Sequence, residues 1–368
     1  MEQESYFPPC ESCGGWRRAE DRRSAADLAG MDASVLDEAR RWNASLGFAS
    51  SVVVIRRGHL VAEWHEGGAA PETSFNIYSC TKSFTGTAYG ILFGERAGCD
   101  SAGGRVGLDS AAYAFLPEGQ PLTDPRKERI TLRHLLSMCS GIAGESHGLY
   151  GFRTEPGVSA FRAALGHAPF LARDTGERIS VANLVAEPGS RWDYSDPAFA
   201  HLSLAFYHLT GQELGQFMQE RVFRKIGIEN AWWSLLGLEG DGIGRHCNPS
   251  GSIYLSARDF ARFGYLMLRR GRWQEEQIVP ASWLDVATRS SQAHYPVYGL
   301  TWWTNHGGTF WPGVPGDAFA AMGFKTNLCC IVPSLDLVVV RLGLGPTDPT
   351  EFVAAPFLAA VSRAAPQT

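Results

Sequence analysis

Apolar residues follow one pattern at the two ends of the chain and another in its middle. Near the start, Ser51–Arg57 and His59–Trp64 are β-rich runs joined tightly through Gly58, so they predict a hairpin. After Pro296 a strand-like pattern returns in four runs: Tyr298–Thr304, Phe319–Phe324, Leu328–Val332 and Leu337–Leu342. The stretch Pro333–Asp336 supplies a turn between the last two runs. The sequence therefore predicts strands from both ends of the chain.

Helical spacing of apolar residues predicts the remaining elements. In Asp32–Leu46, for example, Val35, Leu36 and Ala39 fall on one helical face. The other expected helices are one that begins near Ser79 within Ser74–Gly98, Leu132–Met138, Pro197–Leu209, Glu213–Lys225, one N-capped by Ser256 that reaches about Arg270, and Thr350–Ala364 with a disturbance at Pro356. Long loops separate the helical pieces between residues 108 and 245.

Strands at both ends with helices between them predict an α/β fold of the α+β type. We expect an antiparallel sheet that is built from both chain ends and flanked by helices, with a mostly helical inserted domain. The expected limits are an irregular N-terminal arm at 1–30, a sheet domain at 31–98 and 246–368, and a helical insertion at 99–245. A crevice at the junction of the two parts is where a small-molecule site is expected.

Composition narrows the class of protein. Of the 368 residues, 45% are apolar and 19% charged, which is enough apolar residue for a sizeable core, and the formal net charge of −5 argues against nucleic-acid binding. No apolar run approaches the roughly 18 residues of a membrane span, and the first residues lack the apolar stretch of a secretory signal. The expectation is a soluble cytoplasmic protein. Its oligomeric state is unknown from sequence.

The eight cysteines are scattered, so reduced thiols are expected and not a disulfide framework. Cys10-x-x-Cys13 has the spacing of half a zinc site, but no second Cys/His pair at finger spacing accompanies it. The remaining histidines also lack metal-ligand spacing. We therefore expect neither a metal nor another cofactor.

Ser79-Cys80-Thr81-Lys82 is the sharpest chemical signal. At the start of a helix, a spacing of three residues places the Ser79 hydroxyl and the Lys82 amine on one face. The positive field of the helix N-terminus, together with burial, disfavours the ammonium form of Lys82 and would let it accept a proton. These are the parts of an activated nucleophile. On this motif alone, a helix cap with a solvated lysine is the more probable interpretation.

A second candidate is Tyr194, which stands at the end of the loop Pro188–Pro197, just before a predicted helix. A phenol at this place could relay a proton between the serine, the lysine and a leaving group. Without further context, a packing role for Tyr194 remains the simpler alternative.

From about Trp42 to Gly343 the sequence resembles the serine β-lactamase and penicillin-binding-protein superfamily. Within it, the nearer branch contains class C β-lactamases, family VIII carboxylesterases and 6-aminohexanoate-dimer-type amide hydrolases. Five stretches carry the resemblance: Ser79-x-x-Lys82; Ile130–Gly141, similar to ITxRHLLxHTSG; Pro188–Tyr194, similar to the PGxxWxY approach to a Tyr-x-Asn element; Ser256–Gly264, similar to SARDLARFG; and Val332–Val340, similar to the last strand pair.

The resemblance implies roles for individual residues. Ser79 would be the acylated nucleophile and Lys82 its general base or proton relay. Tyr194 would match the tyrosine of Tyr-x-Asn, helping to deprotonate the serine and to protonate the leaving group. A second register sets Ser195-Asp196-Pro197 against the Ser-Asp-Asn of class A enzymes, but the Pro-Gly-x-x-Trp lead-in favours the tyrosine register.

One departure from the family pattern is Asp196, which stands where the family usually has Asn. An ionised Asp only accepts hydrogen bonds, so a substrate carbonyl would lose a donor. Asp196 could instead hold the Lys82 ammonium or bind an amine on the substrate. A cap on the helix that begins at Pro197 is equally probable.

A second departure concerns the strand motif Lys/His-Thr/Ser-Gly. Its place falls on Ala321-Met322-Gly323, which has no cation, whereas Lys325-Thr326-Asn327 spells a similar motif without the glycine and is the less favoured register. Gly323 would keep the close backbone approach, and the Phe324 N–H would join that of Ser79 as the oxyanion hole. The missing cation weakens the case for binding the carboxylate of a β-lactam.

Two further features have competing interpretations. Gly144-Glu145-Ser146-His147-Gly148 fits the lipase-type G-x-S-x-G pattern, but the piece before Ser146 reads as helix where that motif needs a strand. Aromatic residues cluster late in the chain, around His306. Packing explains them most simply. The alternative is an apolar wall for an acyl or leaving group, with Trp303, His306 and Met322 as substrate-binding candidates.

The sequence thus predicts a cofactor-independent serine hydrolase that forms an acyl-enzyme with an ester or amide of a small molecule. One alternative is a biosynthetic transacylase that passes the acyl group to an amine or alcohol. Another is a non-catalytic homologue that kept the pocket as a ligand-binding site. No motif names the substrate.

Overall fold

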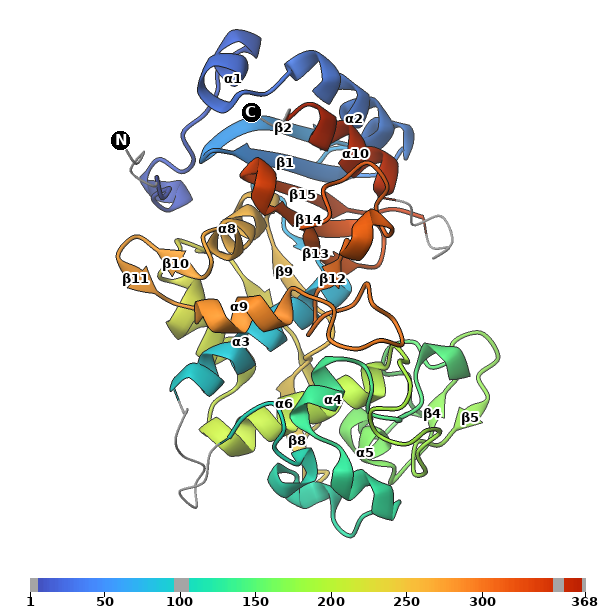
Figure 1. Cartoon of the computed structure of the whole chain (residues 1–368). Helices are drawn as coiled ribbons and strands as arrows, with labels where there is room; N and C mark the ends of the chain where they lie inside the picture. The colour runs from blue at the N-terminus through green and yellow to red at the C-terminus, as the bar shows by residue number, and fades with distance from the viewer. Residues whose placement is uncertain (1–5, 96–105, 347–353, 366–368) are drawn as a thin grey trace.

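The structure is a computed structural model that describes residues 6–95, 106–346 and 354–365. Its largest sheet has six antiparallel strands in the order β12-β13-β14-β15-β1-β2. These strands are β1 (Ser50–Arg56), β2 (His59–Glu66), β12 (Trp303–Thr304), β13 (Phe319–Gly323), β14 (Asn327–Val332) and β15 (Leu337–Gly343). Because β1 pairs with β15, with Ser50 opposite Gly343 and Arg56 opposite Leu337, both ends of the chain build one sheet (Figure 1). The predicted fold class is confirmed.

Helices cover both faces of this sheet. The helices of the described residues are α1 (Arg22–Ala29), α2 (Ala33–Ser45), α3 (Thr81–Glu95), α4 (Leu132–Leu136), α5 (Ala160–Leu165), α6 (Asp196–Thr210), α7 (Leu214–Met218), α8 (Ala257–Leu268), α9 (Ala281–Ala287) and α10 (Ala355–Arg363), and α2, α10 and α8 pack on the sheet. Val52 and Val54 of β1 share a buried cluster with residues of α2 and α10, whereas Val53 and Ile55 belong to the larger core that includes α8. Since the sheet is buried on both faces, its strands appear in the sequence as continuous apolar runs and not as alternating ones.

The segment between the two sheet-forming parts contains α4, α5, α6 and α7 among long loops, and α4, α5 and α6 lie below the large sheet in Figure 1. Short strands accompany these helices: β3 (Phe75–Asn76), β9 (Ile253–Leu255) and β6 (Trp232–Trp233) in one sheet, β4 (Phe170–Leu171) with β5 (Arg178–Ile179), β7 (Leu235–Leu238) with β8 (Gly244–Cys247), and β10 (Arg272–Trp273) with β11 (Glu276–Gln277). The domain limits expected from sequence stay predictions. None of the helices in the described part of the chain has the length and apolar character that a membrane crossing requires.

The N-terminal arm is attached to the fold through α8. Arg262 of α8 is fully buried, and its guanidinium donates to the carbonyl oxygens of Pro8, Pro9 and Ile226. The same guanidinium pairs with the carboxylate of Glu11 at 2.7 Å. A buried cation is tolerated only where its donors find acceptors, so the arm supplies what Arg262 needs.

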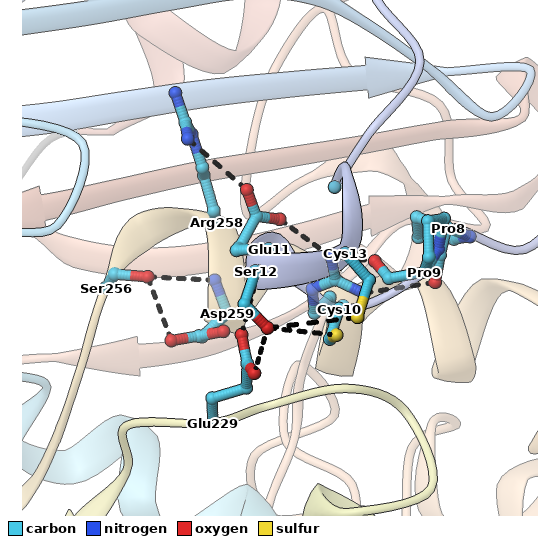
Figure 2. A network of polar contacts seen from close by, with 12 residues as sticks. Pro8, Pro9, Cys10, Glu11, Ser12, Cys13, Glu229, Ser256, Arg258 and Asp259 are labelled. Carbon is cyan, nitrogen blue, oxygen red and sulfur yellow. Dashed lines mark hydrogen bonds and ion pairs between the residues drawn. The ribbon is translucent and has the colours of Figure 1, made fainter.

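Cys10 and Cys13 both lie close to the Ser12 side chain in this arm (Figure 2). The Ser12 hydroxyl donates to Glu229 Oε1 and lies 3.3 Å from Cys10 Sγ and 3.9 Å from Cys13 Sγ. Both thiols are free, and hydrogen bonding with Cys13 and then Ser12 lowers the pKa of Cys10. Within the described ranges, no three His, Cys, Asp or Glu side chains are grouped so as to hold a metal ion.

The expectation of an entirely irregular arm is wrong, because α1 forms within it. Asp21 accepts the backbone N–H of Ser24, and the Ser24 hydroxyl is the acceptor for the Asp21 N–H, so the two residues make a reciprocal capping box. Gly30 ends the helix with a φ of 64°. The Pro- and Gly-rich composition before residue 20 obscured this local signal.

Two further element predictions need correction. The strand expected over Tyr298–Thr304 is reduced to β12, because Thr301 adopts a φ of 70° and the chain turns back so that Tyr298 faces Trp303. Pro356 does not disturb the last helix but stands in its first turn, where no N–H is needed. The expected start of that helix at Thr350 lies outside the described residues.

Candidate active site

Ser79 lies in a short turn that leads into α3. The turn Tyr78–Cys80 is a 3-10 helix, and the first turn of α3 follows it directly. The side chain of Asn76 accepts the backbone N–H of Tyr78 at 2.8 Å and so fixes the entry to the turn. As a result, Ser79 Oγ and Lys82 Nζ meet at a distance of 3.2 Å.

Lys82 is 1% exposed, and its Nζ has three polar contacts. Besides Ser79 Oγ, these are Asp196 Oδ1 at 2.7 Å and the carbonyl oxygen of Ser250 at 3.0 Å. The carboxylate and the carbonyl can only accept, so they take two N–H donors. The third contact works in either direction: an ammonium donates to the Ser79 oxygen, whereas a neutral amine accepts the Ser79 proton. The geometry therefore fits both protonation states of Lys82.

Asp196 is the first residue of α6, but it does not cap that helix. Ser195 is the N-cap, since its Oγ accepts the backbone N–H of Ala198 at 3.1 Å and donates to Ala143 O at 2.9 Å. The cap interpretation of Asp196 is therefore wrong. Its carboxylate instead accepts from Lys82 through Oδ1 and from the Gly151 N–H through Oδ2.

Tyr194 lies beside this pair, with 9% of its surface exposed. Lys82 Nζ is 4.7 Å from the centre of the tyrosine ring. Burial, followed by the charge of Asp196, raises the pKa of the Tyr194 hydroxyl well above its ordinary value, and a side-chain hydrogen bond with Ser79 acts in the opposite direction. The structure thus brings Ser79, Lys82 and Tyr194 together, while Ser195 of the alternative register is occupied by its cap.

The end of β13 presses against the Ser79 turn. A Cβ atom at Gly323 would lie 2.3 Å from Ile77 O, so only glycine allows this approach. The next N–H along the chain belongs to Phe324. Among the described residues neither this N–H nor that of Ser79 has a hydrogen-bond acceptor, so both are available to a bound oxygen.

A cavity of about 280 Å³ opens beside Ser79 and has mostly apolar walls. Aromatic residues dominate the lining, which consists of Ser79, Glu145, Trp192, Tyr194, Tyr295, Trp303, Phe310, Met322, Gly323, Phe324, Lys325, Thr326 and Pro346. The rings of Trp192 and Tyr295 stack at 4.2 Å, and those of Trp303 and Phe310 stack at 5.3 Å. Of the substrate-binding candidates, Met322, Gly323 and Trp303 therefore line this cavity.

His306 is not brought to this cavity. It begins a turn after β12 and lines a separate hollow together with Thr304 and Asp317. Asn305 redirects the chain there, since its side chain bonds the backbone of Trp311 and of the residues that follow it. The sequence placed His306 near the site because it follows Trp303 closely, but the turn carries it away.

Ala321 is buried within β13, so the usual place of the motif cation holds none. Lys325 and Thr326 stand at the tip of the hairpin between β13 and β14, and both line the cavity. Lys325 Nζ lies 5.8 Å from the ring centre of Tyr78. A cation is thus present at the cavity, but it comes from the hairpin tip and not from the strand.

Ser146, the serine of the G-x-S-x-G match, lies in a 3-10 turn and does not follow a strand. Its Oγ donates to Asp193 Oδ2 at 2.7 Å and lies 2.9 Å from His147 Nδ1. The same Nδ1 also faces Asp193, at 3.3 Å. In a catalytic triad the serine and the carboxylate face different ring nitrogens, so this cluster is not one.

Sequence reasoning singled out Ser146 and missed its neighbour Glu145, whose side chain lines the cavity. Burial, and after it the negative charge of Asp196, raises the pKa of Glu145 to about 7. Glu145 stands four residues after Gly141 in a loop, and a lone acidic residue there gives no signal of this kind. Bonds between its loop and the Tyr194 segment bring it to the site: Glu145 N–H donates to Tyr194 O at 2.8 Å, and the N–H groups of Gly144 and Ser146 donate to Asp193.

Comparison with known proteins identifies relatives over most of the chain. A model of the family described as Beta-lactamase matches residues 46–362. An uncharacterized protein of Alkalihalophilus pseudofirmus is 23% identical over 322 residues, which make up 79% of this chain and 82% of that protein.

Solved structures with a similar fold include EstCE1, described as a hydrolase with promiscuous acyltransferase activity. Its TM-score is 0.67 at 16% identity, and the match covers 90% of this chain and 98% of that one. A family VIII carboxylesterase matches with a TM-score of 0.64 at 18% identity, covering 90% of this chain and 97% of that one. At these identities the likeness concerns the fold.

Proposed function

The chain belongs to the β-lactamase family, and on that basis we propose that it is a serine hydrolase that forms an acyl-enzyme with an ester or amide of a small molecule. The observation that carries the proposal is the contact of Ser79 Oγ with Lys82 Nζ, at the point where Tyr194 also faces the cavity. A hydroxyl, a buried amine and a phenol at one place are the components of an activated nucleophile.

Acylation begins with the neutral amine of Lys82. Ser79 Oγ forms a bond with the substrate carbonyl carbon while its proton passes to Lys82 Nζ. The two N–H groups of the neutral amine stay bonded to Asp196 and to the Ser250 carbonyl, and the lone pair accepts the Ser79 proton. The amine therefore keeps its orientation during the transfer. General-base help of this kind contributes roughly 10²–10⁴ in rate.

The carbonyl oxygen becomes an oxyanion as this bond forms. The N–H groups of Ser79 and Phe324 are the proposed donors to it, and one such donor is typically worth roughly 10²–10³ in rate. When the tetrahedral intermediate collapses, the bond to the leaving group breaks and the Tyr194 hydroxyl supplies the proton, which it recovers from Lys82. Water then attacks the carbonyl carbon of the acyl-serine ester and gives a proton to Lys82, the bond to Ser79 Oγ breaks, and Ser79 Oγ takes that proton back as the acid leaves.

The character of the cavity supports esters and amides as substrates. Its aromatic walls suit an apolar acyl or leaving group. Ala321 stands where the Lys/His-Thr/Ser-Gly motif has its cation. The strand therefore lacks the group that would bind the carboxylate of a β-lactam. The family VIII carboxylesterase and EstCE1, both similar in fold, are described as an esterase and a hydrolase.

Fluorophosphonate labelling tests the nucleophile. The probe should attach to Ser79, so the Ser79→Ala variant loses the label. Ser146→Ala is the matched control, since its serine also lies near the cavity and should leave labelling intact. Equal labelling of wild type and Ser79→Ala would remove Ser79 from the mechanism, and loss of the label in Ser146→Ala would point to the G-x-S-x-G serine.

A transacylase is the second candidate, because an apolar cavity of this size gives an amine or alcohol acceptor a place to compete with water. Product analysis with and without added amines separates the two functions. Hydrolysis predicts mainly the free acid, whereas a transacylase forms mainly the amide. A non-catalytic binding protein would give no burst and no turnover with p-nitrophenyl esters, yet its unfolding temperature would rise with ligand.

A further inference from the structure

Glu145 is a carboxyl group in the reaction cavity that has no partner. Its side chain lines the same cavity as Ser79, and its backbone N–H is held by Tyr194 O. Among the described residues, its carboxyl makes no hydrogen bond and no ion pair. A carboxyl group that is largely removed from water and unpaired is unfavourable in its charged form unless a cation joins it.

The charged groups around Glu145 belong to several elements, and most of them already have an ion-pair or hydrogen-bond partner. Lys82 of α3 is paired with Asp196 of α6. Asp193 accepts from the backbone and side chain of Ser146 and lies beside His147.

Arg173, which follows β4, lies 5.4 Å from the ring centre of Phe324 and 5.8 Å from that of Tyr150. Burial, the charges of Asp196 and Asp193, and the opposing charges of Lys82 and Arg173 together place the pKa of Glu145 at about 7. Burial first, and the charge of Glu145 as a further cause, raise the pKa of the Tyr150 and Tyr194 hydroxyls. Of the two cations whose charge acts on Glu145, Lys82 is already paired with Asp196 and Arg173 makes no ion pair with Glu145, so among the described residues this carboxylate has no cation of its own.

The remaining wall is aromatic. The stacked pairs Trp192–Tyr295 and Trp303–Phe310 line the cavity that contains Glu145. Ring faces attract cations, and aromatic walls combined with a carboxylate are a known arrangement for binding alkylammonium groups. Methylene groups next to an ammonium would contact the same rings.

We propose that the substrate of this enzyme carries a protonated amine and that Glu145 is the carboxylate that binds it. This inference rests on the proposed function, because it names the class of ester or amide that the Ser79 cavity takes. Lys325 is the other charged group of the lining. An anionic substrate is therefore the competing possibility, and it forms one arm of the test.

Matched substrates provide the first measurement. One series consists of p-nitroanilides of ω-aminoalkanoic acids, of the methyl-terminated acids of equal length, and of the corresponding dicarboxylic acid monoanilides. A second pair, 4-(aminomethyl)phenyl acetate and 4-ethylphenyl acetate, carries the charge on the leaving group. In wild type, kcat/KM for the ammonium member should exceed that of its neutral partner by about tenfold or more in one of the series.

Substitution of Glu145 tests the assignment. In Glu145→Gln the ratio of the two rates should fall to near one, and in Glu145→Asp part of the preference should return. A general defect in folding or chemistry moves both rates alike and leaves their ratio unchanged. Glu155→Gln is the control, since Glu155 is an exposed acid whose partner Arg178 lies outside the cavity lining, and it should keep the wild-type ratio.

The preference should also rise with pH as Glu145 ionises around pH 7 and persist until the substrate amine loses its proton. Binding alone gives a further readout: hexylammonium should slow fluorophosphonate labelling of Ser79 more than hexanol does in wild type, and equally in Glu145→Gln. Equal rates for charged and neutral members, a preference for the anionic members, or a preference kept by Glu145→Gln would overturn this inference alone. Absence of both labelling and turnover would overturn the proposed function instead.

Discussion

Two lysines are buried among the residues that the structure describes, and their surroundings differ in one decisive respect. Lys82 is 1% exposed and Lys127 is 0% exposed. Lys82 Nζ has a carboxylate oxygen of Asp196 at 2.7 Å. Lys127 Nζ contacts only neutral oxygens, the Thr123 hydroxyl at 2.8 Å and the Leu165 carbonyl at 3.0 Å. Burial is common to both, so it is the partner that separates them.

An acidic residue is close to Lys127 in sequence, but its carboxylate is already bound to another cation. Asp124 binds the guanidinium of Arg126 through both carboxylate oxygens and also accepts the Leu184 N–H at 2.9 Å. Burial lowers the pKa of Lys127 to about 8, and the charge of Asp124 opposes this only in part. Lys127 is therefore a buried lysine that lacks a counter-charge of its own.

The comparison shows that burial alone does not make a lysine part of a reaction site. Lys82 has a nucleophilic hydroxyl within reach and two acceptors that orient it, whereas Lys127 has a hydroxyl that is turned to a backbone carbonyl, Ala182 O. Lys127 also faces Tyr113, which hydrogen-bonds His201 of α6. Lys82 thus contacts the proposed nucleophile, whereas Lys127 lies in a polar network with Thr123 and the Leu165 carbonyl.

Replacing each lysine should give the largest contrast. Lys82→Ala removes the proposed proton acceptor and is expected to lower the rate of acylation by roughly 10²–10⁴. Lys127→Met removes a buried amine far from the lining of the cavity and should keep the rate close to wild type. Burst kinetics with a p-nitrophenyl ester measure both. Equal rates in the two variants would show that the two lysines do not differ in their contribution to acylation.

The stability of Lys127→Met should diverge from wild type with pH. Between about pH 8 and the ordinary value of 10.5, the unfolded chain holds the Lys127 proton and the folded chain does not. Unfolding then takes up a proton, so the free energy of unfolding of wild type rises with pH across this window, by up to about 3 kcal/mol. Lys127→Met lacks this contribution.

Urea unfolding of both proteins at several pH values between 7 and 10.5 checks this expectation. The difference in the free energy of unfolding, wild type minus variant, should become more positive as the pH increases. Other groups titrate in both proteins and cancel in the difference. A difference that stays flat would mean that Lys127 keeps its proton in the folded protein.

Local signals in the sequence were sufficient for much of this structure. The hairpin of β1 and β2, the strands β13 to β15 and the cap of α8 at Ser256 follow from neighbouring residues, and each agrees with the structure. Ser79 and Lys82 meet because three residues separate them at the start of a helix. Such features depend on contacts a few residues apart, which a sequence pattern records directly.

Contacts between distant segments were not predictable in this way. Asp196 and Ser250 are 114 and 168 residues from Lys82, and the contribution of Ser250 is a backbone carbonyl, which any residue could supply. The sequence left Asp196 open between a cap and a partner of the lysine, because Ser195, one residue earlier, could cap equally well. Glu145 likewise reaches the cavity through the pairing of its loop with Asp193 and Tyr194, about 50 residues further along the chain.

The finest test of the comparison makes the surroundings of Lys82 resemble those of Lys127. Asp196→Asn leaves the amine with neutral oxygens only, so the ammonium form loses its counter-charge. The neutral amine that accepts the Ser79 proton then forms at lower pH. Removal of an opposite charge at this distance is expected to move the rising limb of kcat/KM down by about one pH unit, which is about tenfold in rate on that limb.

The substitution also has a small structural effect, because the side-chain amide cannot accept from both Lys82 and Gly151 N–H as the carboxylate does. We expect a loss of about 1 kcal/mol in the free energy of unfolding.

A pH profile of kcat/KM separates the two effects, since lower stability scales all rates but does not move the rising limb. Asp174→Asn, at an exposed carboxyl, is the control and should leave the limb in place. A limb that moves upward in Asp196→Asn would show that the carboxylate assists proton transfer in some way other than by holding the ammonium.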